Sequence, residues 1–182
     1  TSVSGWQIMA LRSARMAGIK IEDRPFQLAA KWLDTIGAGQ NRGLYGYDSR
    51  KLKTDAMVAE GLFAQQLLGT PPSHARMQES IKHIARKLPK KGQRNFYYWY
   101  YATYAMFQFG GKPWQVWNQK MQRALVDTQR AEYKDDSPEV DGSWDPIGEW
   151  GISGGRVYST ALGAMTLEVY YRFERQQEGI GL

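Results

Sequence analysis

The stretch Asn95–Gly111, NFYYWYYATYAMFQFGG, decides the fold of this chain. Almost every position between the polar first residue and the two closing glycines is apolar or aromatic. A helix with that composition has no polar face, so it must be buried on most sides. Three more segments have the same small and aromatic character: Ser4–Gly18, Thr54–Gly69 and Arg156–Arg172.

More polar helical stretches alternate with these four segments. Residues 25–36, 74–88 and 113–129 each place their apolar side chains at helical spacing and leave one polar side. An alternation of apolar and amphipathic helices predicts two layers, an inner and an outer one. The predicted helices are 5–17, 25–36, 55–68, 74–88, 96–109, 113–129 and 157–174, with Ser4 as the first cap and no strand between them. The sequence therefore predicts an all-α fold of antiparallel hairpins.

The composition limits the functions that the chain can have. Its 182 residues suffice for one domain, 1–182, and its net charge of +6 is spread along the chain rather than gathered in a stripe, which argues against nucleic-acid binding. Cysteine is absent, which excludes disulfides, thiolate metal sites and cysteine nucleophiles. No apolar run reaches the ~18 residues of a membrane span. The compartment stays open.

Two loop motifs indicate a family. Gln129 is followed at a distance by Gly142-Ser143-Trp144, and Gln40-Asn41-Arg42-Gly43-Leu44-Tyr45 is a tighter variant with Tyr in the Trp place. Gly154-Gly155 then opens the last apolar segment. These features resemble the glutamine–tryptophan repeats and Gly-Gly loops of the squalene-cyclase and prenyltransferase repeat families. The whole chain looks especially like cyclase-repeat proteins of planctomycete-type bacteria.

The resemblance implies an α/α toroid, or an arc of one. In such repeats a Gln side chain can bond backbone groups at a helix end while the Trp ring packs over the loop. A closed toroid in these families takes about five to seven hairpins. The helices predicted for this chain make about three and a half, which is an arc rather than a closed ring. We therefore expect a homo-oligomer or the C-terminal part of a longer protein.

The chemistry of these families needs residues that are mostly missing here. The cyclases protonate their substrate from a DxDD motif, whereas this chain has Lys134-Asp135-Asp136-Ser137 in a polar loop. The zinc of the prenyltransferases needs Asp, Cys and His. Cys is absent, and His74 and His83 are nine positions apart on opposite sides of one predicted helix, so we expect no metal. No histidine is near Ser159 in the sequence, so a catalytic triad is not indicated.

Two acids lie on otherwise apolar segments. Glu60 and Glu168 would each need a partner if buried, and Arg12 or Arg156 could supply one. We interpret them mainly as structural ion pairs.

The functional expectation is a binding domain of the cyclase-repeat type without the catalytic acid, facing an isoprenoid lipid or a protein partner, with no cofactor. One alternative is an active isoprenoid cyclase whose acid lies in a missing half. Another is a carbohydrate-processing α/α domain, which would require Trp144, Trp150 and Tyr47 to line one groove. Loops before inner helices converge at one pole of a toroid, and Glu60 is an acid on an inner helix. The candidate site is therefore Tyr45, Tyr47, Asp48, Glu60, Trp144, Asp145 and Arg156.

Overall fold

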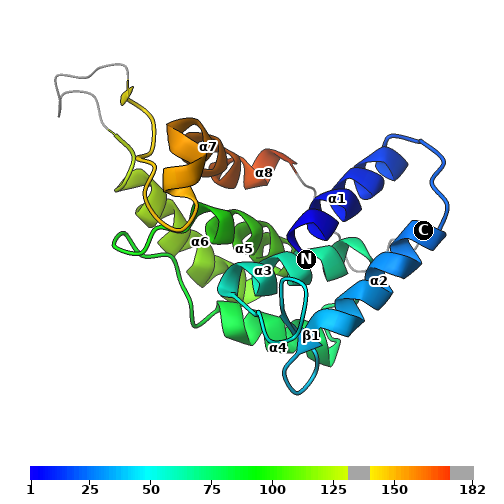
Figure 1. The fold of residues 1–182 in the computed structure, drawn as a ribbon. Helices are drawn as coiled ribbons and strands as arrows, with labels where there is room; N and C mark the ends of the chain where they lie inside the picture. Colours follow the sequence, from blue (N-terminus) through cyan, green and yellow to red (C-terminus); the bar gives the residue numbers. More distant parts are fainter. Residues whose placement is uncertain (131–139, 173–182) are drawn as a thin grey trace. The chain divides into compact units, whose positions relative to one another are not determined.

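The computed structural model describes residues 1–130 and 140–172 (Figure 1). The described part is built from helices and one very small sheet. The helices are α1 (Ser2–Met16), α2 (Arg24–Ile36), α3 (Asp55–Leu67), α4 (Ala75–Ile84), α5 (Phe96–Phe109), α6 (Gly111–Val126), α7 (Gly151–Leu167) and α8 (Val169–Arg172). The predicted all-α class is confirmed. No helix within the described ranges is long and apolar enough to cross a membrane.

The chain divides into two compact units. Unit 1 is Thr1–Lys87 and contains α1 to α4, and unit 2 is Leu88–Leu182 and contains α5 to α8. In unit 1, α3 packs against both α1 and α4. In unit 2, α5 packs against both α6 and α7. The prediction of one domain over 1–182 stays a prediction.

Local signals fix several helix ends. The side chains of Thr54, His74 and Asn95 accept backbone N–H groups at the starts of α3, α4 and α5. Gly69 follows α3 with φ 86°, a conformation that suits glycine, and its N–H bonds back to the carbonyl of Gln66. Helix ends of this kind can be predicted because the residues that make them are close in sequence.

Several predicted ends were wrong. Thr1 rather than Ser4 stands at the N-cap of α1, since the helix begins at Ser2. Helix α4 ends at Ile84 rather than residue 88, because the chain tightens into turns ahead of Pro89. Helix α6 ends at Val126 because Gln129 pairs with Trp144 instead of continuing the helix.

The last predicted helix differs most. Helix α7 begins at Gly151 rather than residue 157 and is kinked at Gly155, whose φ of 74° lies outside the helical range. A break at Glu168 then separates α7 from α8. Residues 173–174, the rest of the predicted helix, lie outside the described residues.

The expectation of no strands was also wrong. Gly37–Ala38 (β1) pairs antiparallel with Leu44–Tyr45 (β2). The loop between them is held from α4, where the carboxylate of Glu79 accepts N–H groups from Gln40, Asn41 and Gly43 at 2.8, 3.0 and 2.8 Å. A contact across more than thirty-five residues of sequence leaves no local pattern from which to predict the hairpin.

Burial separates the four apolar helices into two pairs. Every residue of α3 after Asp55 is buried, and so is nearly all of α5. By contrast, α1 buries Gly5 and Ile8, and α7 buries few side chains among its seventeen residues. The expectation of helices buried on most sides is right for α3 and α5 and wrong for α1 and α7.

The aromatic run of α5 forms the core of unit 2. Rings meet edge to face along it, with Tyr100 and Tyr104 centroids 4.7 Å apart and Tyr98 5.7 Å from Trp117 of α6. Two polar side chains inside this core are hydrogen-bonded: Trp117 Nε1 donates to Thr103 Oγ1 at 2.9 Å, and the Tyr104 hydroxyl donates to the Met165 carbonyl at 2.9 Å. The rings of α5 therefore pack against one another and against α6 in the core of unit 2.

Both units contain the same contact between an aromatic ring and a helical glycine. A Cβ added at Gly61 of α3 would lie 2.3 Å from the ring of Tyr45, and one added at Gly163 of α7 would lie 2.9 Å from the ring of Trp144. In each unit the aromatic residue ends the loop motif that precedes the helix. The tyrosine thus occupies the place predicted for it, that of the tryptophan.

Replacing Gly61 with alanine should destabilise the protein by about 1–3 kcal/mol, because the new methyl group overlaps a ring that cannot withdraw from the core. Chemical denaturation measures the change. Gly92→Ala is the matched control, since nothing lies within 4 Å of a Cβ there. Equal stability of the two variants would show that the ring does not fix the position of α3.

Candidate functional site

The segment between α6 and α7 brings together three of the predicted site residues. It is closed at its base, where Arg130 N–H donates to the Ser143 carbonyl at 2.8 Å and Gly142 N–H donates to the Arg130 carbonyl at 2.9 Å. The side chain of Gln129 also donates to the Gly142 carbonyl, at 2.7 Å. Trp144 and Asp145 follow this closed base directly, and Arg156 contacts Ser143 and Asp145 from α7.

Trp144 connects the loop to two helices. Its ring is buried against Gly163 of α7, and its indole N–H donates to the Leu125 carbonyl near the end of α6 at 2.9 Å. Its backbone N–H donates to Thr160 Oγ1 of α7 at 3.2 Å. The helix-end bond expected from the glutamine is therefore made by the tryptophan, while Gln129 bonds the loop.

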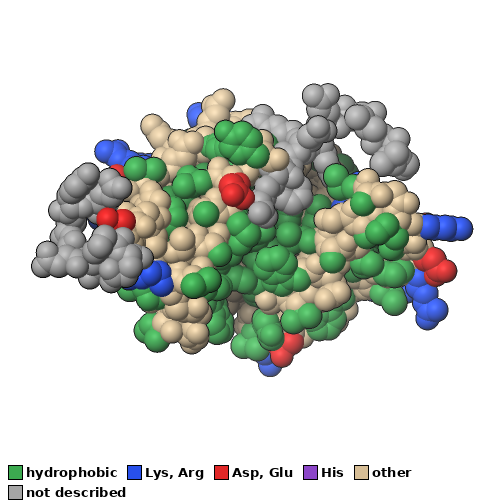
Figure 2. Space-filling view, turned by 90° about the horizontal axis from the view of Figure 1, so that it is seen from above, with side chains coloured by type: hydrophobic (Ala, Val, Ile, Leu, Met, Phe, Trp, Pro, Cys, Tyr) green, Lys and Arg blue, Asp and Glu red, His purple; other side chains and the backbone are tan. Residues whose placement is uncertain are grey.

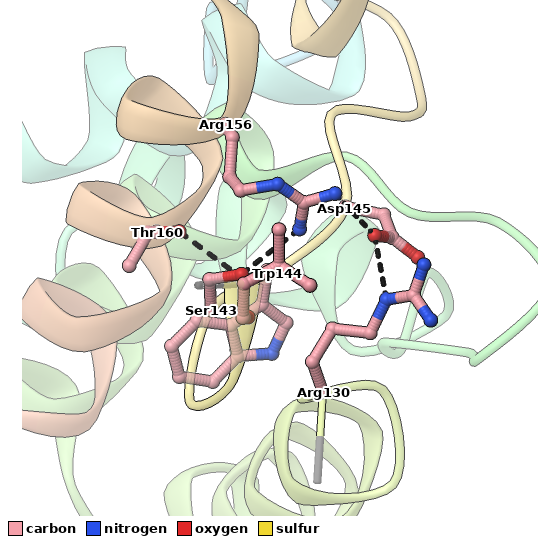
Figure 3. A network of polar contacts seen from close by, with 7 residues as sticks. Arg130, Ser143, Trp144, Asp145, Arg156 and Thr160 are labelled. Carbon is pink, nitrogen blue, oxygen red and sulfur yellow. Dashed lines mark hydrogen bonds and ion pairs between the residues drawn. The ribbon is translucent and has the colours of Figure 1, made fainter. Parts of the chain in front are cut away.

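Asp145 lies between two guanidinium groups (Figure 3). One carboxylate oxygen accepts from Arg130 Nε at 2.9 Å and from Arg156 at 2.8 Å. The other arm of Arg156 donates to Ser143 Oγ at 2.9 Å. Arg156 thus pairs with Asp145 rather than with the glutamates for which the sequence suggested it.

This geometry sets the charge of Asp145. Partial burial raises its pKa, but the hydrogen bonds and charges of Arg156 and Arg130 outweigh burial, so the pKa lies below its ordinary value of 3.8. A carboxylic acid that protonates an alkene or epoxide needs the opposite shift. Asp145 is therefore an ionised structural group in this arrangement.

Four predicted site residues lie in unit 1, near the start of α1. Tyr45 is buried, whereas Tyr47 and Asp48 are exposed in the loop before α3. Glu60 of α3 is fully buried, and a Cβ added at Gly5 of α1 would lie 2.1 Å from its Oε1. This close approach shows that α1 covers the Glu60 carboxylate.

The N-terminal residue joins this group. The Thr1 ammonium donates to the Tyr47 carbonyl, and the Thr1 hydroxyl donates to the Gly46 carbonyl. Burial lowers the pKa of the Thr1 ammonium, and the negative charges of Glu60 and Asp48 oppose that shift. The contact of Thr1 with Tyr47 and the close approach of Gly5 to Glu60 place this group near the start of α1.

Tyr45 does not act as an acid or base at neutral pH. Burial raises its pKa to about 12, against the lowering effects of Arg76 and Gln65. Its phenol keeps its proton, and its ring packs on Gly61. The structure thus gives Tyr45 and Trp144 the same packing role in the two units.

Other acids of the described part also have structural partners. Asp55 Oδ1 is 2.7 Å from His83 Nε2, and Asp34 Oδ1 is 2.6 Å from the Arg76 guanidinium. His74 caps α4, so the two histidines serve different contacts. Among the residues that the structure describes, no three His, Asp or Glu side chains gather as metal ligands. Asp135 and Asp136 lie outside the described residues.

Sequence reasoning missed the partners that define the site. Arg130, Ser143 and Thr160 hold Asp145, Arg156 and Trp144 in place, and Glu79 holds the corresponding loop of unit 1. Arg130 follows the glutamine of the motif directly, which is the one signal that could have identified it. Ser143 and Thr160 are ordinary polar residues with no spacing that distinguishes them.

Replacing Asp145 with asparagine should lower the free energy of unfolding by about 1 kcal/mol at pH 7, since the three side chains are about one-third exposed and solvent screens them. The depressed pKa means that this stabilisation is present above pH 3.8 and is lost as the pH falls through the folded-state pKa. Denaturation curves of the protein and of Asp145→Asn should therefore converge in acid.

Asp127→Asn is the control, because Asp127 is exposed at the end of α6. Its effect on stability should be small at every pH. A difference between the protein and Asp145→Asn that stayed constant down to pH 2 would contradict the ion-pair role of Asp145.

Comparison with known proteins gives no match to this chain, whether with family models, curated proteins or solved structures. The cyclase-repeat resemblance therefore remains an expectation from the sequence motifs. Function has to be inferred from the contacts and exposed surfaces described above.

Proposed function

We propose that this chain is a helical repeat domain of the squalene-cyclase and prenyltransferase type, an arc of an α/α toroid, that binds an apolar ligand or partner and does not supply the catalytic acid. The ligand is an isoprenoid lipid or an apolar protein segment. The observation that carries the proposal is an uncharged side of α7 that stays exposed although the matching side of α3 is covered. The two sides are matched by aligning Gly61 of α3 with Gly163 of α7, the glycines that contact Tyr45 and Trp144.

Aligning Gly61 with Gly163 places Asp55, Ala59 and Leu62 of α3 level with Val157, Ala161 and Ala164 of α7. Residues at this spacing lie on one side of a helix. On α3 that side faces α4, because Asp55 contacts His83 of α4 and the two helices pack together. The equivalent side of α7 has no such cover within the described residues.

The uncovered side of α7 is well suited to an apolar contact. Val157 is 83% exposed, and Ala161 and Ala164 are also exposed. Arg156 is the one charged residue between Gly151 and Leu167, and Asp145 binds it. Figure 2 shows that hydrophobic side chains are also exposed elsewhere on the surface. An apolar partner would remove this area from water, which favours binding.

Among the residues that the structure describes, three aspartates are held in ion pairs, which supports a binding role over catalysis. Asp145 is held ionised by two arginines, and Asp55 and Asp34 are paired. The carbohydrate alternative is weakened because the ring of Trp144 is buried and cannot stack on a sugar. A cyclase whose acid lies in another part of a longer protein stays an alternative.

Native mass spectrometry of the purified protein, with and without an isoprenoid lipid extract, tests the proposal. We expect a retained lipid mass or a concentration-dependent dimer. Val157→Lys with Ala161→Lys should abolish either form of binding, because two charges would have to be buried. Val126→Lys is the control, as Val126 is a valine with 62% exposure on α6.

Circular dichroism establishes that the double variant keeps its fold. A monomer that retains no ligand under any condition would contradict the proposal. Binding that survives the two lysines would place the contact elsewhere than on α7.

A further inference from the structure

Helix α1 has an uncharged exposed side of the same kind as the side of α7 described above. It is formed by Val3, Trp6 and Ala10, which follow one another at helical spacing. Val3 is 66% exposed and Trp6 43%, and Ala10 is also exposed. The helix packs against α3 through its other side, where Gly5 lies against the Glu60 side chain. Unit 1 and unit 2 therefore each expose an uncharged helix side.

The two sides complement each other in size. The α7 side presents Ala161 and Ala164, which allow a facing helix to come close, whereas the α1 side presents the large ring of Trp6. A large side chain packs best where the facing helix has small ones, because the two surfaces then interdigitate without a void. Two α7 sides would bring alanine against alanine, and two α1 sides would bring tryptophan against tryptophan. Shape therefore favours a contact between unlike sides.

Charge favours the same contact. Unit 1 contains thirteen Lys and Arg against seven Asp and Glu, so it holds the whole net charge of +6, and unit 2 is neutral. Two α1 sides would bring two positively charged units together, and these repel. An α1 side that meets an α7 side brings a positive unit to a neutral one. The exposed Glu168, one turn beyond Ala164, would then face a helix that contains no acid.

We infer that a second copy of this chain is the partner of the α7 side, and that its α1 side makes the contact. Trp6 of one copy packs against Ala161 and Ala164 of another. The contact is heterologous, because the two copies use different surfaces, so each added copy leaves an α1 side and an α7 side open. The inference rests on the proposed function, since it names the occupant of the α7 side.

Complementation between two blocked variants of the full chain tests this inference by native mass spectrometry and sedimentation. Val3→Lys with Ala10→Lys blocks the α1 side, and Val157→Lys with Ala161→Lys blocks the α7 side, because association would bury unpaired charges. Each variant alone should be monomeric at concentrations where the unmodified protein associates. An equimolar mixture should form a heterodimer and grow no further, since each variant keeps the side that the other lacks.

The ring of Trp6 has a matched control. Trp6→Ala should raise the dissociation constant of the contact about 30-fold, the effect of removing a tryptophan from the centre of an interface. Trp150→Ala should leave it unchanged, because Trp150 is similarly exposed, at 54%, but precedes α7 and lies on neither side. Circular dichroism and thermal melting verify that every variant is folded.

Association of the α1-blocked variant with itself would overturn the inference, because the α7 side would then have a different partner. A mixture of the two variants that stays monomeric would also overturn it, and so would an unmodified protein that is monomeric at every concentration. A lipid retained by such a monomer, and lost from the α7-blocked variant, would leave the proposed function intact. Binding that survives the α7 lysines would instead contradict the proposed function, so the two failures can be told apart.

Discussion

The structure depends on one contact that occurs in both units, an aromatic ring pressed onto a glycine in the middle of a helix. Tyr45 lies against Gly61 and Trp144 lies against Gly163, with no room for a methyl group between them. This contact fixes how closely the preceding loop approaches the helix. Trp144 adds a second constraint, because its indole N–H satisfies the Leu125 carbonyl at the end of α6. One side chain therefore joins two helices and the loop between them.

Much of the helical fold could be predicted from the sequence, because its causes are local. Caps such as Thr54 and Asn95 and the stop at Gly69 are readable within a few residues. The small sheet and the kink at Gly155 could not be predicted, because they depend on distant partners or on one glycine conformation. Helix α7 has the composition of a buried helix, but composition does not reveal whether a neighbour exists to cover it.

Three of the seven predicted site residues lie together in the structure, but the sequence did not predict their contacts, and the site itself stays a prediction. Trp144, Asp145 and Arg156 do come together, yet their arrangement depends on Arg130, Ser143 and Thr160. Of these three, Arg130 alone has a sequence signal, its place directly after Gln129. Asp145 and Tyr45 illustrate why position alone is insufficient. Two arginines depress the pKa of Asp145, while burial raises that of Tyr45, and both groups end up in the protonation state that stabilises the fold. Carboxylates used in this way are unavailable as proton donors.

The same repeat also explains where the two units can differ. Asp55 and Val157 stand at matching positions, yet Asp55 pairs with His83 while Val157 is 83% exposed. A charged residue at that position can pair at the edge of the contact between two helices. An exposed valine is unfavourable in water, and covering it with an apolar surface lowers the free energy. Full burial of such a side chain is worth about 1.5–3 kcal/mol, enough to favour a partner but too little to bind one alone. The binding proposed at α7 must therefore use several side chains of this side together, which the spacing of Val157, Ala161 and Ala164 allows.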